Sequence, residues 1–113
     1  MQITNEYGFS RMDKMNMMSC NKDIKKLDGA ITIVGAIEYI DADKETGEAK
    51  PVGAVKTDNG DIYGFTSQTL IETLDMIIDS FNDGVKSIRL TTVTGKSNAG
   101  RTFYQFKVLD MVE

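Results

Sequence analysis

Stretches rich in β-branched and aromatic residues alternate with polar, turn-forming stretches along most of the chain. Such runs predict β-strands, here at residues 30–40, 52–57, 62–66, 87–94 and 102–111. Between the third and fourth runs, apolar residues recur at the spacing i, i+1, i+4, i+7, i+8, i+11, which predicts one helix over residues 69–81. The predicted order is therefore βββ-α-ββ. The buried face of the helix would consist of Leu70, Ile71, Leu74, Ile77, Ile78 and Phe81.

Local signals refine these elements. Gly35 interrupts the first strand and predicts a bulge or a sharp bend. Asn59 and Gly60 predict a type I′ hairpin turn between the second and third strands, because both residues tolerate the positive φ angles of that turn. Thr69 and Glu72 can form a capping box at the start of the helix, and the Asn-Asp-Gly sequence of residues 82–84 predicts its end.

The first 28 residues show no strand-like alternation and contain five of the seven methionines. They predict an N-terminal arm with one short helix near residues 11–18. Because methionine fills irregular gaps, we expect the arm to pack over one end of the core, with a partner-binding role as the alternative. Cys20 is expected to be an inert thiol. The methionines of the arm are Met1, Met12, Met15, Met17 and Met18.

Residues 29–113 are expected to form one mainly β domain with a single helix. A meander of three strands, a helix and a closing hairpin, with the first strand bent at a glycine, is the order of a five-stranded Greek-key barrel of the oligonucleotide-binding (OB) type. The predicted architecture is therefore an OB-like barrel preceded by a Met-rich N-terminal arm. An open α+β sandwich is the alternative. The length of 113 residues is typical of one domain.

Composition limits the chemistry that the chain can perform. With one cysteine and no histidine, it can form neither an intramolecular disulfide nor a four-ligand Cys/His zinc site. It also lacks the commonest general base, so we expect no enzymatic activity. Carboxylate or metal chemistry is the alternative, but no metal site is expected. The apolar stretches are too short for a membrane helix, and the first residues do not resemble a signal peptide. A cytoplasmic location is expected.

Charge is unevenly distributed, although the net charge is only −4. Residues 84–109 contain five basic and no acidic side chains, whereas residues 67–83 contain four acidic and no basic ones. A basic closing hairpin with an acidic helix elsewhere suits a protein that follows a phosphate backbone on one side. A solvated surface that discourages aggregation of strand edges is the alternative. The basic residues are Lys86, Arg89, Lys96, Arg101 and Lys107.

Aromatic residues accompany these cations on the last strand. Alternation places Phe103 on the same face as Arg101 and Lys107, and it places Tyr104 and Phe106 on the opposite face, which is expected to be core. A nucleic-acid base could stack on Phe103 while the neighbouring cations bind phosphates. The last strand therefore predicts a binding face and a core face.

The third strand adds a second candidate surface. Tyr63 and Phe65 share one of its faces, Lys56 lies close by in sequence, and OB barrels usually bind oligonucleotides on their second and third strands. For Phe65 a core position is the stronger alternative. The acidic loop of residues 41–50, which would flank the groove, counts against nucleic acid. The candidate nucleic-acid-binding residues are Lys56, Tyr63, Phe65, Lys86, Arg89, Lys96, Arg101, Phe103 and Lys107.

The segment from Val93 to Tyr104 reads Val-Thr-Gly-Lys-Ser-Asn-Ala-Gly-Arg-Thr-Phe-Tyr and follows an amphipathic helix. In this layout, from Gly29 to Leu109, the chain resembles the small single-stranded DNA-binding proteins encoded by bacterial phages. The resemblance implies an OB-like fold, sequence-tolerant binding of single-stranded DNA in phage DNA replication or recombination, and no cofactor. It also implies a location in the host cell cytoplasm.

Two functional hypotheses follow. The first is a module that binds single-stranded DNA. The second is an acidic protein-interaction module, for example a phage inhibitor of a host nucleic-acid-binding protein, which the sequence pI of about 4.8 favours. A homodimer and a replication or host protein remain open as further partners, and no membrane partner is expected.

Overall fold

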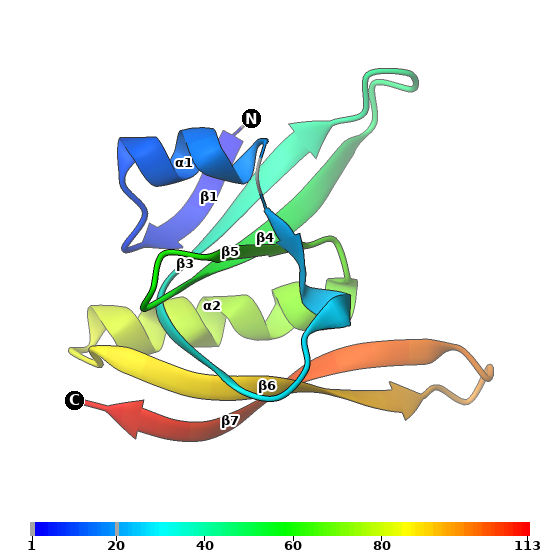
Figure 1. Cartoon of the computed structure of the whole chain (residues 1–113). Coiled ribbons are helices and arrows are strands. Elements are labelled where there is room, and N and C mark those ends of the chain that lie inside the picture. Colours follow the sequence, from blue (N-terminus) through cyan, green and yellow to red (C-terminus); the bar gives the residue numbers. More distant parts are fainter. Residues whose placement is uncertain (1, 20) are drawn as a thin grey trace.

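A curled sheet of seven strands forms the body of the molecule (Figure 1). The structure is a computed structural model, and it describes residues 2–19 and 21–113. The five predicted strands and the predicted amphipathic helix are confirmed, with ends that differ by a few residues. The strands are β1 (Gln2–Tyr7), β2 (Lys22–Asp23), β3 (Ile31–Ala42), β4 (Ala49–Thr57), β5 (Ile62–Phe65), β6 (Ser87–Lys96) and β7 (Thr102–Val112). The helices are α1 (Arg11–Met17), the 3₁₀ helix η1 (Ile24–Lys26) and α2 (Gln68–Asn82).

Strand β3 is the centre of the sheet because it pairs with three other strands. One edge pairs with β4 over residues 33–42, and the other edge pairs first with β6 over residues 31–33 and then with β1 over residues 36–40. The pairing with β4 shifts register between Ile33 and Gly35, which confirms the predicted irregularity at this glycine. The shift lets one strand belong to two parts of the curled sheet.

The sheet is barrel-like, but it is not the closed five-stranded barrel with one helix that the sequence predicted. Its order is β2-β5-β4-β3-β6-β7, with β1 on the second edge of β3. Closure would require β5 to pair with β7. Among the described residues, β5 pairs instead with the short parallel strand β2. Phe65 of β5 and Phe106 of β7 still meet edge to face, with ring centroids 5.4 Å apart.

The N-terminal segment contains the predicted short helix, and it also contains strands that were not predicted. Helix α1 begins with a capping box between Ser10 and Asp13. The expectation that this segment holds no strand is wrong, because β1 and β2 are part of the sheet. Their side chains are mostly exposed, so their pairing depends on backbone hydrogen bonds and leaves no hydrophobic alternation in the sequence. Tyr7 also stacks on Phe81 of α2, with ring centroids 5.0 Å apart.

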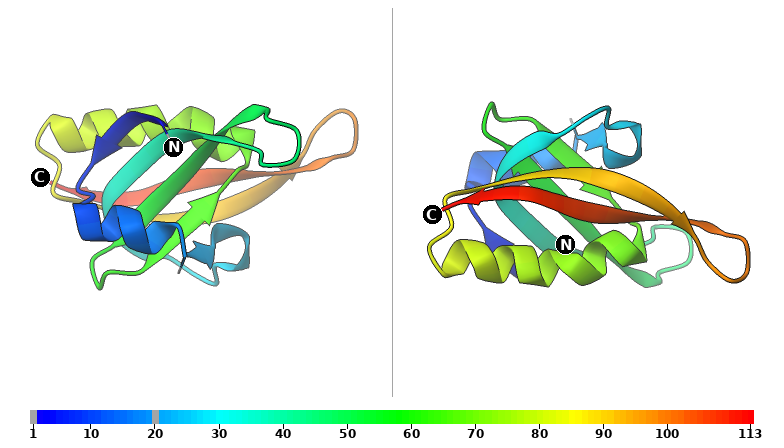
Figure 2. Two further views of the ribbon diagram at one scale, coloured as in Figure 1. Left: turned by 90° about the horizontal axis from the view of Figure 1, so that it is seen from above. Right: turned by 90° about the horizontal axis from the view of Figure 1, so that it is seen from below.

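Two hydrophobic clusters lie on opposite sides of the β3–β4–β5 part of the sheet, and each is covered by one helix (Figure 2). The larger cluster lies under α2, whose six predicted core residues are all buried. The smaller cluster lies under α1 and includes Phe9 and Met17 of the N-terminal segment together with Ile37 and Ile62. Of the other arm methionines, Met12, Met15 and Met18 are exposed, and Met1 lies outside the described residues.

Two local predictions are wrong for identifiable reasons. The turn between β4 and β5 is not type I′, because Gly60 has a positive φ angle and Asn59 does not. The Thr57 N–H donates to the carbonyl of Asp61 across a three-residue loop, and Gly60 takes the left-handed position that such loops require. The start of α2 has no capping box, since its N-cap is Ser67 and the hydroxyl of Thr69 donates to the carbonyl of Tyr104. The predicted end before Gly84 is confirmed.

A pair of carboxyl groups joins β3 to α2. The pKa of Glu38 is raised from 4.5 to about 7. Burial is the largest cause, and the neighbouring carboxyl of Asp75 adds to it through hydrogen bonding and charge repulsion. The side-chain amide of Asn5 donates to Asp75 at 3.1 Å, and the hydroxyl of Thr4 donates to the carbonyl of Glu38 at 3.1 Å. The pair therefore also lies beside β1, and below about pH 7 Glu38 holds a proton in the folded state.

We predict that this pair makes stability depend on pH. Because the folded state binds the Glu38 proton more tightly than the unfolded state, the free energy of unfolding should fall as pH rises from about 4.5 to about 7. Glu38→Gln should leave stability at pH 4.5 unchanged and raise it at pH 8 by about 1 kcal/mol, a value reduced for solvent screening. Denaturant unfolding at both pH values measures this. The exposed control Glu48→Gln should show no such gain, and equal shifts in both variants would contradict the prediction.

Candidate nucleic-acid interface

The β6–β7 hairpin projects from the body of the molecule (Figure 1) and has two chemically different faces. Tyr104 and Phe106 turn inward and pack against the larger core cluster. The cross-strand pairs Val93 with Gln105 and Gly95 with Phe103 lie on the opposite face. The predicted division of β7 into a core face and an outer face is therefore confirmed for these aromatic residues.

Phe103 lies across Gly95 on the outer face. A Cβ atom built on Gly95 would lie 2.5 Å from Cζ of the Phe103 ring, so the glycine leaves the space that the ring occupies. The ring is half-buried by this contact, and a π-face held close to a strand is the geometry on which a base can stack. The glycine thus positions the aromatic side chain.

Three of the five predicted cations share the outer face, and two do not. Arg89 and Lys107 lie on the same side of the hairpin as Phe103. Arg101 ends the β6–β7 loop, two residues before Phe103. Lys86 and Lys96 have the opposite alternation and lie at the two ends of β6. Within residues 2–19 and 21–113, none of these five side chains forms an ion pair, and all five are exposed. Their charge is therefore available to a ligand.

Lys25 of η1 extends this charge, and the sequence analysis missed it. Its ammonium group lies over the ring of Tyr104 at 5.2 Å. Lys22 of β2 lies over the ring of Tyr63 at 5.9 Å, but it pairs with Asp61 at 3.2 Å, so its charge is neutralised. The hydroxyl of Thr91, on the outer face of β6, donates to the carbonyl of Gly29 at 2.7 Å, which holds the chain after η1 against the hairpin. Three lysines within residues 22–26 were a visible signal, but the segment had been assigned to the arm.

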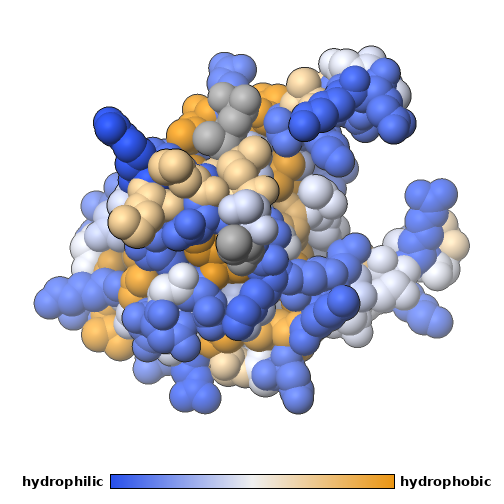
Figure 3. Space-filling view, turned by 45° about the horizontal axis from the view of Figure 1, so that its top comes forward, coloured by the Kyte–Doolittle hydropathy of each residue, from blue (hydrophilic) through white to orange (hydrophobic). Residues whose placement is uncertain are grey.

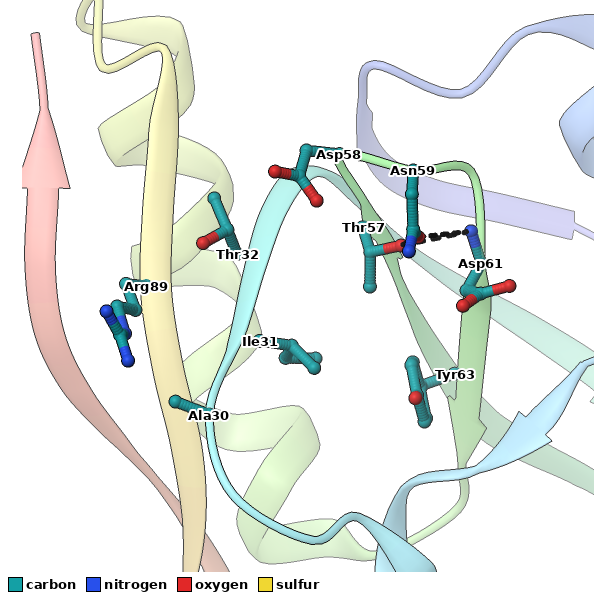
Figure 4. Close-up of a pocket in the computed structure, with 9 residues that line it drawn as sticks. All are labelled: Ala30, Ile31, Thr32, Thr57, Asp58, Asn59, Asp61, Tyr63 and Arg89. Atoms are coloured by element: carbon teal, nitrogen blue, oxygen red, sulfur yellow. Dashed lines mark hydrogen bonds between the residues drawn. The ribbon is translucent and has the colours of Figure 1, made fainter.

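Tyr63 lines a cavity of about 370 Å³ that also borders Arg89 of β6 (Figure 4). Its ring and the side chain of Ile31 point toward one another across the opening, whereas the guanidinium of Arg89 points away. Asp58 and Asp61 also line the cavity. Carboxylates repel phosphates, so this cavity does not continue the cationic surface. The structure does not bring Tyr63 and Phe103 together on one face.

The side chains of Phe65 and Lys56 are engaged within the fold, so neither is a candidate for ligand binding in this structure. Phe65 is only 6% exposed, as its alternative core assignment predicted. Lys56 lies under α1, where its ammonium group pairs with Asp13 at 2.8 Å. Burial alone would raise the pKa of Asp13, but hydrogen bonds from Lys56 and Ser10 outweigh this effect and lower it. The charge of Lys56 is therefore neutralised by a carboxylate from the N-terminal segment.

The acidic loop and the acidic helix lie away from the outer face of the hairpin, but Asp110 lies on that face, opposite Arg89. The tips of the β3–β4 and β6–β7 hairpins form two hydrophilic projections on the right of Figure 3. At the β3–β4 tip, backbone N–H groups of Glu45 and Thr46 donate to Asp43 and lower the pKa of its carboxyl. The predicted acidic loop is thus a fixed turn that is separate from the basic one.

The remaining chemistry of the described residues adds no second site. These residues contain no cluster of three or more His, Cys, Asp or Glu side chains that could hold a metal ion. No helix among them combines the length and the apolar content needed to cross a membrane. Cys20 lies outside the described residues, so its expected inertness stays a prediction.

Comparisons with known proteins give no family assignment. No family model, no curated protein and no solved structure matched this chain. What the chain does must therefore be inferred from its own residues.

The position of Phe103 leads to a prediction about its cross-strand glycine. Because the ring lies across Gly95, its ring current should shift the Gly95 Hα resonances upfield in an NMR spectrum of the free protein. Phe103→Leu should abolish the shift and preserve the backbone pattern of the hairpin. Unshifted Gly95 resonances in the unmodified protein would show that the ring does not hold this position in solution.

Proposed function

We propose that the protein binds single-stranded DNA without sequence preference through the outer face of the β6–β7 hairpin. The observation that carries this proposal is one face on which Phe103 is held against Gly95 and accompanied by exposed cations that form no ion pair within residues 2–19 and 21–113. Cations that neutralise phosphates supply affinity that is independent of sequence, and an aromatic ring accepts the face of any base. A stacked base must be unpaired, which favours a single strand over a duplex.

The connectivity of the sheet supports the proposal. From β3 to β7 the chain follows the order of an OB-like Greek-key barrel, with the helix between the third and fourth strands of that barrel. In OB-folds, oligonucleotides bind the second and third strands and the loops that join strands one to two and four to five. Here the second of these loops is the tip of the β6–β7 hairpin, and the first is the acidic β3–β4 loop. Since α1 covers Lys56 and its neighbours on β4 and β5, the ligand would contact mainly the hairpin.

A charge reversal should reveal the phosphate contacts. Arg101→Glu should lower the affinity for a labelled oligothymidine roughly tenfold and reduce the slope of log K against log salt by about 0.7 for each lost contact. Fluorescence anisotropy at several salt concentrations measures both. The matched control is Arg11→Glu, the same charge change on α1, and it should leave the slope unchanged. The hypothesis fails if the unmodified protein does not bind the oligonucleotide even at low salt.

Stacking predicts a different pattern of effects. Phe103→Ala should cost about 1–3 kcal/mol of binding free energy, whereas Phe103→Trp should retain the affinity because it keeps a large π-face. The salt slope should stay constant in both variants, since no phosphate contact is lost. Equal losses for alanine and tryptophan would mean that Phe103 does not stack on a base. A duplex of equal length should bind more weakly to all three proteins.

A protein-interaction module is the second proposal, and the surface of α2 favours it. Glu72, Asp79 and Asp83 are exposed, and none of them forms an ion pair among the described residues. Such a surface could imitate a phosphate backbone toward a host nucleic-acid-binding protein. A protein of this kind would not bind free oligonucleotides, so the anisotropy titration separates the two proposals.

For the first proposal, single-stranded DNA binding, the proposed biological setting is phage DNA replication or recombination.

A further inference from the structure

An apolar groove runs between α2 and the inner face of β7. Its cavity volume is about 230 Å³, and the hydroxyls of Thr73 and Ser80 at its rim donate to carbonyls of α2 itself. The groove therefore presents mainly hydrophobic atoms. Much of this apolar surface is exposed: Met76 is 71% exposed, Val108 42% and Met111 40%. The groove is lined by Thr73, Met76, Ile77, Ser80, Phe106, Val108 and Met111.

The groove follows the edge of β7 that faces away from β6. Among the described residues, β7 pairs with β6 only. The carbonyl of Tyr104 points away from β6, because it accepts the hydroxyl of Thr69 on α2. Backbone groups of alternate residues point the same way along a strand, so those of Phe106 and Val108 also point outward. Such an edge is a template for another strand.

A bulge makes this edge complementary to itself. The register between β6 and β7 shifts between Arg89 and Leu90, so that Val108 pairs with Leu90 and Asp110 with Arg89. Leu109 is therefore an extra residue, and Lys107 and Asp110 both lie on the outer face. When two copies of β7 pair antiparallel about Val108, Lys107 of each copy faces Asp110 of the other. Phe106 of each copy then faces Met111 of the other on the groove side.

We propose that the occupant of this groove is a second copy of the chain, paired through β7 in a two-fold symmetric dimer. The symmetry axis passes beside Val108, so the two Val108 side chains meet. Met111 of each copy covers Phe106 of the other, and two pairs of opposite charge flank the axis. The hairpins of both copies form one four-stranded ribbon, which joins their outer faces. The dimer forms without nucleic acid, so a test of its mass without DNA does not depend on the proposed function.

The position of Val108 on the axis provides a sharp test. By sedimentation equilibrium without DNA, the unmodified protein should have twice the 12.5 kDa mass of one chain. Val108→Lys and Val108→Glu should each be monomeric, because like charges meet at the axis. An equimolar mixture of the two variants should recover the dimer, since opposite charges then meet. This recovery also shows that both variants are folded.

Val93→Lys is the matched control. Val93 is 38% exposed, close to the 42% of Val108, but it lies on the outer face of β6 away from the edge. This variant should remain dimeric. Hydrogen exchange should show protected Phe106 and Val108 amides in the unmodified protein and fast exchange in Val108→Lys. A monomeric mass for the unmodified protein, or a dimer that persists in Val108→Lys, would overturn the proposal.

Discussion

The fold depends on a close approach between two backbone segments that only glycine permits. A Cβ atom on Gly35 would lie 2.8 Å from the carbonyl oxygen of Tyr7, and one on Gly8 would lie 2.7 Å from that of Val34. At this contact the second edge of β3 passes from β6 to β1. Any side chain here would push β1 away from the bend. The curl of the sheet and the placement of the N-terminal segment therefore have the same steric origin.

Placement of the N-terminal segment decides which surfaces remain free for a ligand. After the contact at Gly8, the chain enters α1, which buries Phe9 and Met17 against the far side of the sheet. Asp13 then neutralises Lys56, so this cation of β4 is not available to a ligand. The cations Arg89, Arg101 and Lys107 of the β6–β7 hairpin stay exposed. The close contact at Gly8 and Gly35 therefore directs α1 over β4 and leaves the cationic hairpin exposed.

Sequence patterns predicted the elements whose side chains are buried on one side. The six core residues of α2 and the division of β7 into Tyr104 and Phe103 faces followed from periodicity, because burial imposes that periodicity. Sequence patterns did not predict the features that depend on backbone pairing or on contacts between residues distant in sequence. Strand β1 has few buried side chains, the turn at Asn59 takes a three-residue form, and α1 covers Lys56 through contacts distant in sequence. The positions of Lys22 and Lys25 depend on the unpredicted pairing of β2 with β5.

A net charge of −4 is compatible with an anionic ligand because the acidic helix and the outer-face cations occupy different layers. The acidic helix α2 packs on the inner face of the hairpin, whereas Arg89 and Lys107 lie on the outer face, where Asp110 stands opposite Arg89. Packed layers of secondary structure lie about 8–10 Å apart, which is comparable to the Debye length at physiological ionic strength. A phosphate in contact with Arg101 is therefore influenced mainly by that cation. At longer range the net negative charge opposes encounter, so affinity must come from contacts on the hairpin and not from electrostatic steering.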